Sequence, residues 1–552
     1  MTSDTPSTPT APAPNHAGGP DSDHYLSHRQ ILVVLGGIMA GMLLAALDQS
    51  IVSTALPVVV SDLGGLDKLS WVITAYLLTS TAATPLWGKI SDLYGRRLIF
   101  QLAIGIFIVG SALCGLSQNM PELITFRAFQ GIGGGGLMSI AFAIIGDVIP
   151  PRERGRYQGY FGAVFGLSSV AGPLLGGWFT DGPGWRWIFY VNLPVGIAAL
   201  LITSVALKLP TVRREHRIDY LGAAVIIGAV SSLLLYLNWA GIAYGWTAPG
   251  PLVLLAAFVL LGVLFVLVEL RAVEPIIPMR LFANPVFRVG NLYGFLAGVA
   301  MFGGIIFLPL YMQAVLGYSP TASGLAMLPA VIGIFSTSIT SGQLITRTGR
   351  YKIYPILGAA ILVGALGGLA TLGTDTPYWQ LAVTEFAFGA GLGLTMQTIV
   401  TAVQNSVEFR DMGVATSSTT FFRQMGASIG TAVFGAVLAS RLTTHITEQF
   451  AHAPAAVAGN AAGVNVDAND IQAIARLAAP VRALVLRAFA DALDDVFLVG
   501  VPFVLVALVT ALFLKEIPLR SRGDGPSAPG SSGSSGPSAP SGGGDPVLAD
   551  AH

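Results

Sequence analysis

The sequence predicts an all-α polytopic membrane protein, and three observations lead to this prediction. Hydrophobic residues make up 53% of the 552-residue chain, and only 11% are charged, where soluble domains have about 25%. The mean hydropathy is +0.70. The apolar residues form long runs, of which 252–270 and 497–514 are clear examples. A helix of about 20 apolar residues crosses a bilayer core. In lipid, a single spanning segment can form the hydrogen bonds of its backbone only as a helix.

The apolar runs predict fourteen spanning helices, an even number that places both termini on one side. Most of the 29 Lys and Arg residues fall on the side of the N-terminus, and this bias marks the cytoplasmic face. Both termini are therefore predicted to be cytoplasmic. The predicted spans are 31–55, 70–87, 98–116, 122–145, 158–180, 187–207, 219–239, 252–270, 289–311, 322–345, 353–373, 379–402, 413–439 and 493–514.

An internal repeat divides the chain into two halves. The motif GKISDLYGRR (Gly88–Arg97) recurs in degenerate form as GQLITRTGR (Gly342–Arg350). Two homologous six-helix bundles with two additional helices between them fit this pattern, with a substrate site between the halves. The predicted domains are a disordered cytoplasmic tail at 1–28, the N-terminal bundle at 29–208, two additional helices at 209–275, the C-terminal bundle at 276–514 with an outer loop at 441–490, and a second disordered cytoplasmic tail at 515–552.

The end of the outer loop, 471–489, has apolar residues at helical spacing, although Pro480 interrupts it. This pattern suggests an amphipathic helix on the outer membrane surface. Such a helix could capture substrate or could simply connect two spans.

The turn between the second and third spans is predicted to control access from the cytoplasm. Gly88 and Gly95 allow a tight turn and close helix approach, and Asp92 and Arg96 can pair because they are four residues apart. Arg97 completes the motif. A simple cluster of positive charge on the inside is the alternative, but it requires neither the glycines nor the aspartate.

Two charges inside early spans are candidates for proton coupling. Asp48 lies in the segment that ends the first span, and Arg127 lies in the fourth. From a rise of about 1.5 Å per residue, both side chains reach a similar depth and can pair. A purely structural ion pair is the alternative to a protonatable site. The nearby glycines at 131, 133 and 136 form a literal G-x-G-x-x-G, but no strand precedes them, so close helix packing explains them better.

The second half carries two further charges inside spans, Glu385 and Arg423. Alignment of the glycine-rich runs, with Gly389 opposite Gly131, puts Glu385 at the position equivalent to Arg127. Glu385 is predicted to be a proton site or an anchor for cationic substrates. A neutral hydrogen-bonded acid, or an ion pair with Arg423, is the structural alternative.

In this order, the motifs resemble the major facilitator superfamily, and within it the fourteen-span drug:proton antiporters of actinobacterial type. The segment LDQSIVSTALP (47–57) is similar to the first-span signature of that family, although Ser53 replaces its usual asparagine. The repeated turn motif has Thr346 where the first copy has Asp92. An element similar to the antiporter signature is formed by Gly172, Pro173, Gly176 and Gly177. The segment WRWIFYVNLPVG (185–196) is interpreted only as an interfacial anchor.

The resemblance implies a proton-coupled exporter of small apolar or cationic molecules such as drugs and antibiotics, acting by alternating access. A transporter of lipids, siderophores or sugars with the same fold is the alternative. The chain lacks a GxxxxGK[ST] phosphate loop, and its seven histidines all lie outside the predicted spans, which leaves carboxylates to carry protons. With one cysteine and zero net charge, no metal site, nucleic acid or cofactor is expected, and no enzymatic activity. The expected protein is a monomer in the bacterial inner membrane.

Overall fold

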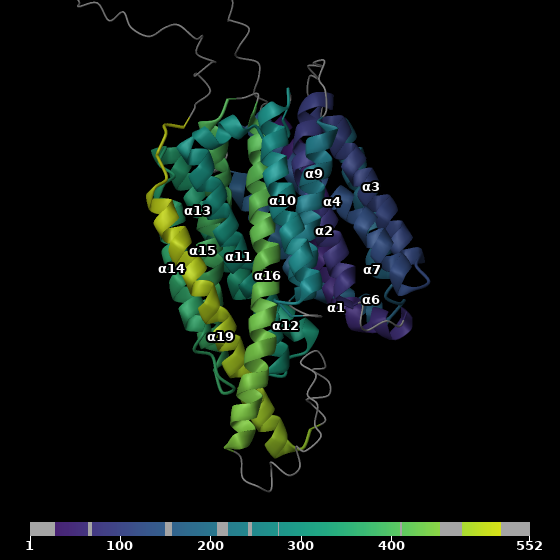
Figure 1. Cartoon of the computed structure of the whole chain (residues 1–552), viewed down its shortest axis with the longest axis vertical. Helices are drawn as coiled ribbons and strands as arrows, with labels where there is room; N and C mark the ends of the chain where they lie inside the picture. The colour runs from purple at the N-terminus through teal and green to yellow at the C-terminus, as the bar shows by residue number, and fades with distance from the viewer. Residues whose placement is uncertain are drawn as a thin grey trace, which may run out of the picture.

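A computed structural model describes residues 28–63, 69–149, 157–206, 219–240, 245–273, 275–408, 411–452 and 477–519. Within these residues every regular element is a helix, and the long helices stand side by side in one elongated bundle (Figure 1). The first half contains α1 (His28–Leu63), α2 (Leu69–Tyr94), α3 (Arg96–Leu116), α4 (Met120–Val148), α6 (Gln158–Asp181), α7 (Trp187–Tyr190) and α8 (Asn192–Ala206).

Two additional helices and the second half follow. The additional pair is α9 (Tyr220–Asn238) and α10 (Pro249–Arg271). The second half contains η5 (Met279–Ala283), α11 (Pro285–Ala314), α12 (Pro320–Ala326), α13 (Leu328–Thr348), α14 (Ile353–Leu369), α15 (Tyr378–Ser406), α16 (Met412–Ala451) and α19 (Ala479–Leu512).

Short polar side chains begin several of these helices. Asn119 accepts a hydrogen bond from the backbone of Glu122 and begins α4, and Asn284 begins α11 in the same way. Such caps satisfy backbone N–H groups that have no partner inside the helix. Gly349 ends α13 in the left-handed conformation with φ 72°, which glycine adopts without steric cost.

The predicted all-α polytopic fold is confirmed. In the described part of the chain, eleven helical segments are long and apolar enough to cross a membrane. Three further helices, α2, α6 and α14, coincide with the remaining predicted spans. Every one of the fourteen predicted spans therefore falls on a helix.

The two halves repeat the same packing. Helix α4 packs on α2 and α3, and α15 packs on α13 and α14 in the corresponding way. Glycines allow the close approach in both cases: a Cβ on Gly131 would overlap Tyr76 and Thr79 of α2, and one on Gly389 would overlap Ala330 of α13. These matching contacts support the alignment of Gly131 with Gly389, and with it the equivalence of Arg127 and Glu385.

The bundles meet where α2 and α4 pack on α16, and where α6 packs on α12 and α13. The additional pair covers this junction: α9 packs on both α2 and α16, through an apolar cluster that joins Ala82, Leu233 and Phe421. Helix α10 leaves most of its apolar surface exposed, including Val253 and Leu260. An exposed apolar face of this size fits a helix that contacts lipid.

Three predicted boundaries differ from the structure: the two ends of the outer loop and the start of the C-terminal tail. The outer loop predicted at 441–490 is helical at both ends, because α16 extends to Ala451 and α19 begins at Ala479. These two helices project beyond the others at the lower end of Figure 1. Pro480 lies in the first turn of α19, where its missing N–H has no cost, so it begins this helix instead of interrupting one. Residues 453–476 lie outside the described residues.

The surface helix predicted at 471–489 is wrong for its described part. Val481 and Val485 are buried in the core of the second bundle, at the start of α19. Residues 515–519 also do not behave as a tail, since the Lys515 carbonyl accepts a hydrogen bond of 2.9 Å from the Tyr351 hydroxyl. The rest of both predicted tails, 1–27 and 520–552, lies outside the described residues.

Candidate functional site

Asp48 of α1 and Arg127 of α4 form an ion pair inside the first bundle. The distance from Arg127 Nη1 to Asp48 Oδ2 is 2.5 Å. Asp48 is fully buried and Arg127 is 2% exposed. The predicted pairing is therefore confirmed. An ion pair withdrawn from water in this way is stable only if the remaining donors and acceptors also find partners.

Neutral side chains complete the surroundings of this pair. Asp48 Oδ1 accepts hydrogen bonds from Gln130 Nε2 at 2.9 Å and from Asn192 Nδ2 at 3.1 Å. Arg127 donates a second bond to Gln130 Oε1 at 2.9 Å, and its guanidinium lies 4.4 Å from the centroid of the Tyr76 ring. Four helices, α1, α2, α4 and α8, thus hold one charge pair.

Gln130 and Asn192 were not predicted as site residues. Asn192 lies in the segment that was interpreted only as an interfacial anchor, and it also donates to Ser111 Oγ at 3.0 Å. A neutral amide in an apolar helix attracts less notice than a charge. The signal that could have found Gln130 is its position three residues after Arg127, on the same face of the helix.

The anchor interpretation does describe the start of that segment. Trp185 Nε1 donates to Asp62 Oδ2 at 2.8 Å, and Arg186 pairs with the same oxygen at 3.1 Å. These two donors hold the pKa of the Asp62 carboxyl below its usual value. They join the end of α1 to the beginning of α7, at the end of the molecule opposite Arg96.

The predicted antiporter element lies in α6, directly against α1. A Cβ on Gly172 would overlap the Ser50 side chain, two residues from Asp48. Ser50 Oγ also donates to the Ser168 carbonyl at 2.9 Å. Only glycine at position 172 allows α6 to approach α1 this closely, so this helix contact is built beside the ion pair.

The rest of the element continues along α6. The Thr180 hydroxyl bonds the carbonyls of Gly176 and Gly177 at 2.8 and 2.9 Å. The side chain of Pro173, like that of Ser53 in α1, lies outside the described residues.

The first copy of the turn motif builds a charge cluster at the end of the bundle where Arg96 lies, called the Arg96 end below. Arg96 pairs with Asp92, as predicted, and also with Asp147 of α4 at 2.7 Å. Its Nη1 donates to Ser91 Oγ at 2.6 Å. Asp147 was not predicted, and it ties the turn to the fourth span.

This cluster lies directly against the second bundle. A Cβ on Gly413 of α16 would overlap the side chains of Asp92 and Arg96. One on Gly88 of α2 would overlap Ser417 of the same helix. The glycines of both partners therefore let α2 and α16 touch, and the Arg96 end is closed in this structure.

The remaining residues of the two turn motifs have different roles. Gly95 has φ 95° and Gly349 of the second copy has φ 72°, so both turns require a left-handed residue. Arg97 does not join the contact between the bundles: its Nη2 donates to the Ser204 carbonyl of α8 at 2.6 Å. In the second copy, Thr346 bonds the carbonyl of Gly342.

Glu385 and Arg423 do not pair. Glu385 is fully buried in α15, and neither of its carboxylate oxygens has a hydrogen-bond partner among the described residues. The structural alternative of an ion pair with Arg423 is therefore wrong, and the hydrogen bond to a neighbouring helix is also not found among the described residues. An ionised carboxylate without a partner would be costly at this place.

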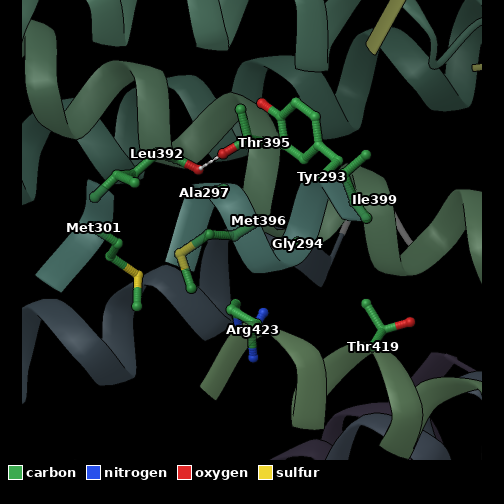
Figure 2. A pocket seen from close by; sticks show the side chains of 10 residues that line it. All are labelled: Tyr293, Gly294, Ala297, Met301, Leu392, Thr395, Met396, Ile399, Thr419 and Arg423. Carbon is green, nitrogen blue, oxygen red and sulfur yellow. Dashed lines mark hydrogen bonds between the residues drawn. The ribbon is translucent and has the colours of Figure 1, made fainter. Parts of the chain in front are cut away.

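Arg423 of α16 lines a small cavity within the second bundle (Figure 2). The cavity has about 20 Å³ of free space, which is room for about one water molecule. Drug-sized molecules need ~300 Å³ or more. This cavity is therefore too small for a drug-sized molecule, which could enter it only if its walls separate. The lining residues are Tyr293, Gly294, Ala297, Met301, Leu392, Thr395, Met396, Ile399, Thr419 and Arg423.

Two repeated bundles, buried charges within spans and a closed contact at one end define a membrane transporter of the alternating-access type. The chain belongs to the Major Facilitator Superfamily, whose family profile matches residues 38–431.

Known proteins agree with this assignment. The chain is 42% identical to an uncharacterized MFS-type transporter of Mycobacterium tuberculosis over 93% of its own length and 73% of that protein. It is 39% identical to the multidrug transporter protein MdtP of Bacillus subtilis, over 90% of this chain and 95% of MdtP. The crystal structure of the human organic anion transporter MFSD10 has the same fold, with a TM-score of 0.56 at 16% identity, over 86% of this chain and 99% of that one.

Proposed function

We propose that this protein is a proton-coupled antiporter that exports small apolar or cationic molecules, including drugs and antibiotics, by alternating access. In this proposal the protein lies in the bacterial inner membrane with both termini in the cytoplasm. It acts as a monomer, without a cofactor and without enzymatic activity. The buried Asp48–Arg127 ion pair carries the proposal, because its carboxylate can accept a proton. The similarity to a protein named as a multidrug transporter supports the substrate class.

Protonation of Asp48 would change the packing of the first bundle. The neutral acid no longer balances Arg127, and a buried cation without its partner costs about 3–5 kcal/mol. A rearrangement that gives Arg127 new partners or water is then favoured. Since Ser50 of α1 rests on Gly172 of α6, and α6 packs on α13, movement of α1 is passed to the second bundle.

The Arg96 end would open and close in this cycle. Asp92 and Arg96 rest on Gly413 only while α2 and α16 touch. Opening toward the cytoplasm requires this contact to separate, so the charge cluster would set the rate of opening. The substrate cavity would expand at the same time.

Transport by purified protein in proteoliposomes tests the proposal. An imposed pH gradient should drive uptake of a cationic dye into vesicles that contain the wild type, and Asp48→Asn should abolish it. Gradient-independent dye movement would contradict antiport. Movement of a lipid, siderophore or sugar in place of the dye would indicate the other substrate class.

A further inference from the structure

Arg423 occupies an unusual position for a guanidinium group. It lies in α16, and its side chain reaches the cavity described above together with those of Met301 and Met396 (Figure 2). Its Cζ atom is 5.7 Å from the centroid of the Phe142 ring in α4. The guanidinium group therefore lies where the two bundles face each other.

No anion in the described part of the chain balances this charge. Two other arginines of the described residues do have carboxylate partners: Arg127 pairs with Asp48, and Arg280 pairs with Asp411. Arg423 is partly buried. Among the described residues, its guanidinium has no carboxylate within 4.0 Å and no hydrogen bond, and the cavity wall beside it contains no acidic residue. Among the described residues, the contact found for its guanidinium is the face of the Phe142 ring.

The rest of the cavity wall cannot supply the missing charge. It contains no acidic residue. Two of its polar groups are already used within the protein: the Tyr293 hydroxyl donates to the Pro355 carbonyl at 3.1 Å, and the Thr395 hydroxyl donates to the Leu392 carbonyl at 3.0 Å. Glu385 lies roughly 10 Å farther along α15 than Leu392, by the rise of a helix, and is outside the cavity.

An apolar cavity with one unbalanced guanidinium is a receptor for an apolar molecule that carries an oxyanion. Methionine and aliphatic side chains adapt to varied apolar shapes. The guanidinium fork matches a carboxylate with two parallel hydrogen bonds, and burial strengthens such bonds because water does not compete. A molecule without an oxyanion forms no such bonds with Arg423.

We propose that Arg423 binds a carboxylate, or a similar oxyanion, on amphipathic molecules that this transporter exports. This inference rests on the proposed export function and adds a substrate class to it, namely zwitterions and organic acids with a large apolar part. The anion binds when the bundles separate and the cavity expands, and it takes over from Phe142 as the partner of the guanidinium.

Two dyes that differ only at one carboxyl group test the inference. Rhodamine 110 carries a free carboxylate, and rhodamine 123 is its methyl ester. Pure wild type, Arg423→Gln and Arg423→Lys are compared by transport in proteoliposomes under a pH gradient and by fluorescence polarisation in detergent. Arg288→Gln is the matched control, because Arg288 is an exposed arginine of α11.

Arg423→Gln should weaken binding of rhodamine 110 and raise its KM about tenfold or more, the effect of a lost hydrogen bond to a charged group. The KM for rhodamine 123 should change less than twofold. In Arg423→Lys, the KM for rhodamine 110 should lie between the values of wild type and Arg423→Gln, and that for rhodamine 123 should stay near wild type. Arg288→Gln should change neither the binding nor the KM of either dye.

Equal loss of both dyes in Arg423→Gln would overturn the inference, because it would show that Arg423 only supports the packing. Failure of the wild type to bind rhodamine 110 while it exports rhodamine 123 would also overturn it, and would leave the proposed export function standing. Absence of gradient-driven transport of either dye would refute the export function, while polarisation would still measure binding at Arg423.

Discussion

Neutralising both members of the Asp48–Arg127 pair should harm stability less than neutralising one. Asp48→Asn leaves the Arg127 cation buried at 2% exposure, and Arg127→Gln leaves the carboxylate fully buried. Loss of one partner from such a pair costs about 3–5 kcal/mol. The double variant has no uncompensated charge, and amides can still bond Gln130 and Asn192. Its loss should therefore be smaller than the sum of the two single losses by about 2 kcal/mol or more.

The assay is equilibrium unfolding of the four proteins in detergent. The Asp62–Arg186 pair provides a matched cycle in the same molecule, since these side chains are 50% and 36% exposed. That cycle should give a coupling free energy of no more than about 1 kcal/mol. Additive losses in the Asp48–Arg127 cycle would refute the reasoning, because they would show that neither charge depends on the other.

Three further variants test the contacts between helices and the role of Glu385. Gly413→Ala should slow transport more than it weakens substrate binding, because a methyl group would push α2 from α16, whereas Gly435→Ala on the same helix meets open space and should leave both unchanged; equal loss of binding and turnover would contradict a gating role. Gly172→Ala should lower thermal stability and pH-driven export together by separating α6 from Ser50, and wild-type behaviour in both assays would argue against this. Glu385→Gln should affect cationic and neutral substrates alike, since this side chain is outside the cavity; a selective loss of cation export would identify it as a substrate anchor.

Sequence reasoning found the ion pair because charge in an apolar helix is conspicuous and its depth follows from the helical rise. The number of spans followed from the length of the apolar runs, because the helical rise fixes how many residues cross the bilayer. Asn192 and Asp147 could not be found in this way. Their roles depend on which faces of different helices meet, and such long-range packing is not encoded in the local pattern.

The outer segment shows a different limit. Polar residues between 441 and 451 predicted a loop, but α16 continues through them because α19 packs alongside. His445 Nε2 lies 2.9 Å from Asp495 Oδ2, and Arg441 lies 3.4 Å from the same oxygen. Contacts between two helices supply the stability that an isolated polar helix lacks. Composition alone therefore placed the boundary too early.

The same limit explains why equivalent positions in the two halves differ in their surroundings. Arg127 and Glu385 correspond, yet only Arg127 has an opposite charge. Three residues after the arginine stands Gln130, which bonds the ion pair. Three residues after the glutamate stands Phe388, a buried ring that would overlap a Cβ on Gly304 of α11.

An aromatic ring thus stands where the first half has the amide that bonds the ion pair, and it fills the space with apolar atoms. The two halves share the helix packing through Gly131 and Gly389 but differ in these polar contacts. Gain of a proton removes a charge from the first bundle and breaks a pair there. In the second bundle, Glu385 has no pair to break, but loss of its proton would leave a buried anion without a hydrogen-bond partner among the described residues. A proton would thus act differently in the two halves: in the first it would break an ion pair, and in the second its loss would create an isolated charge.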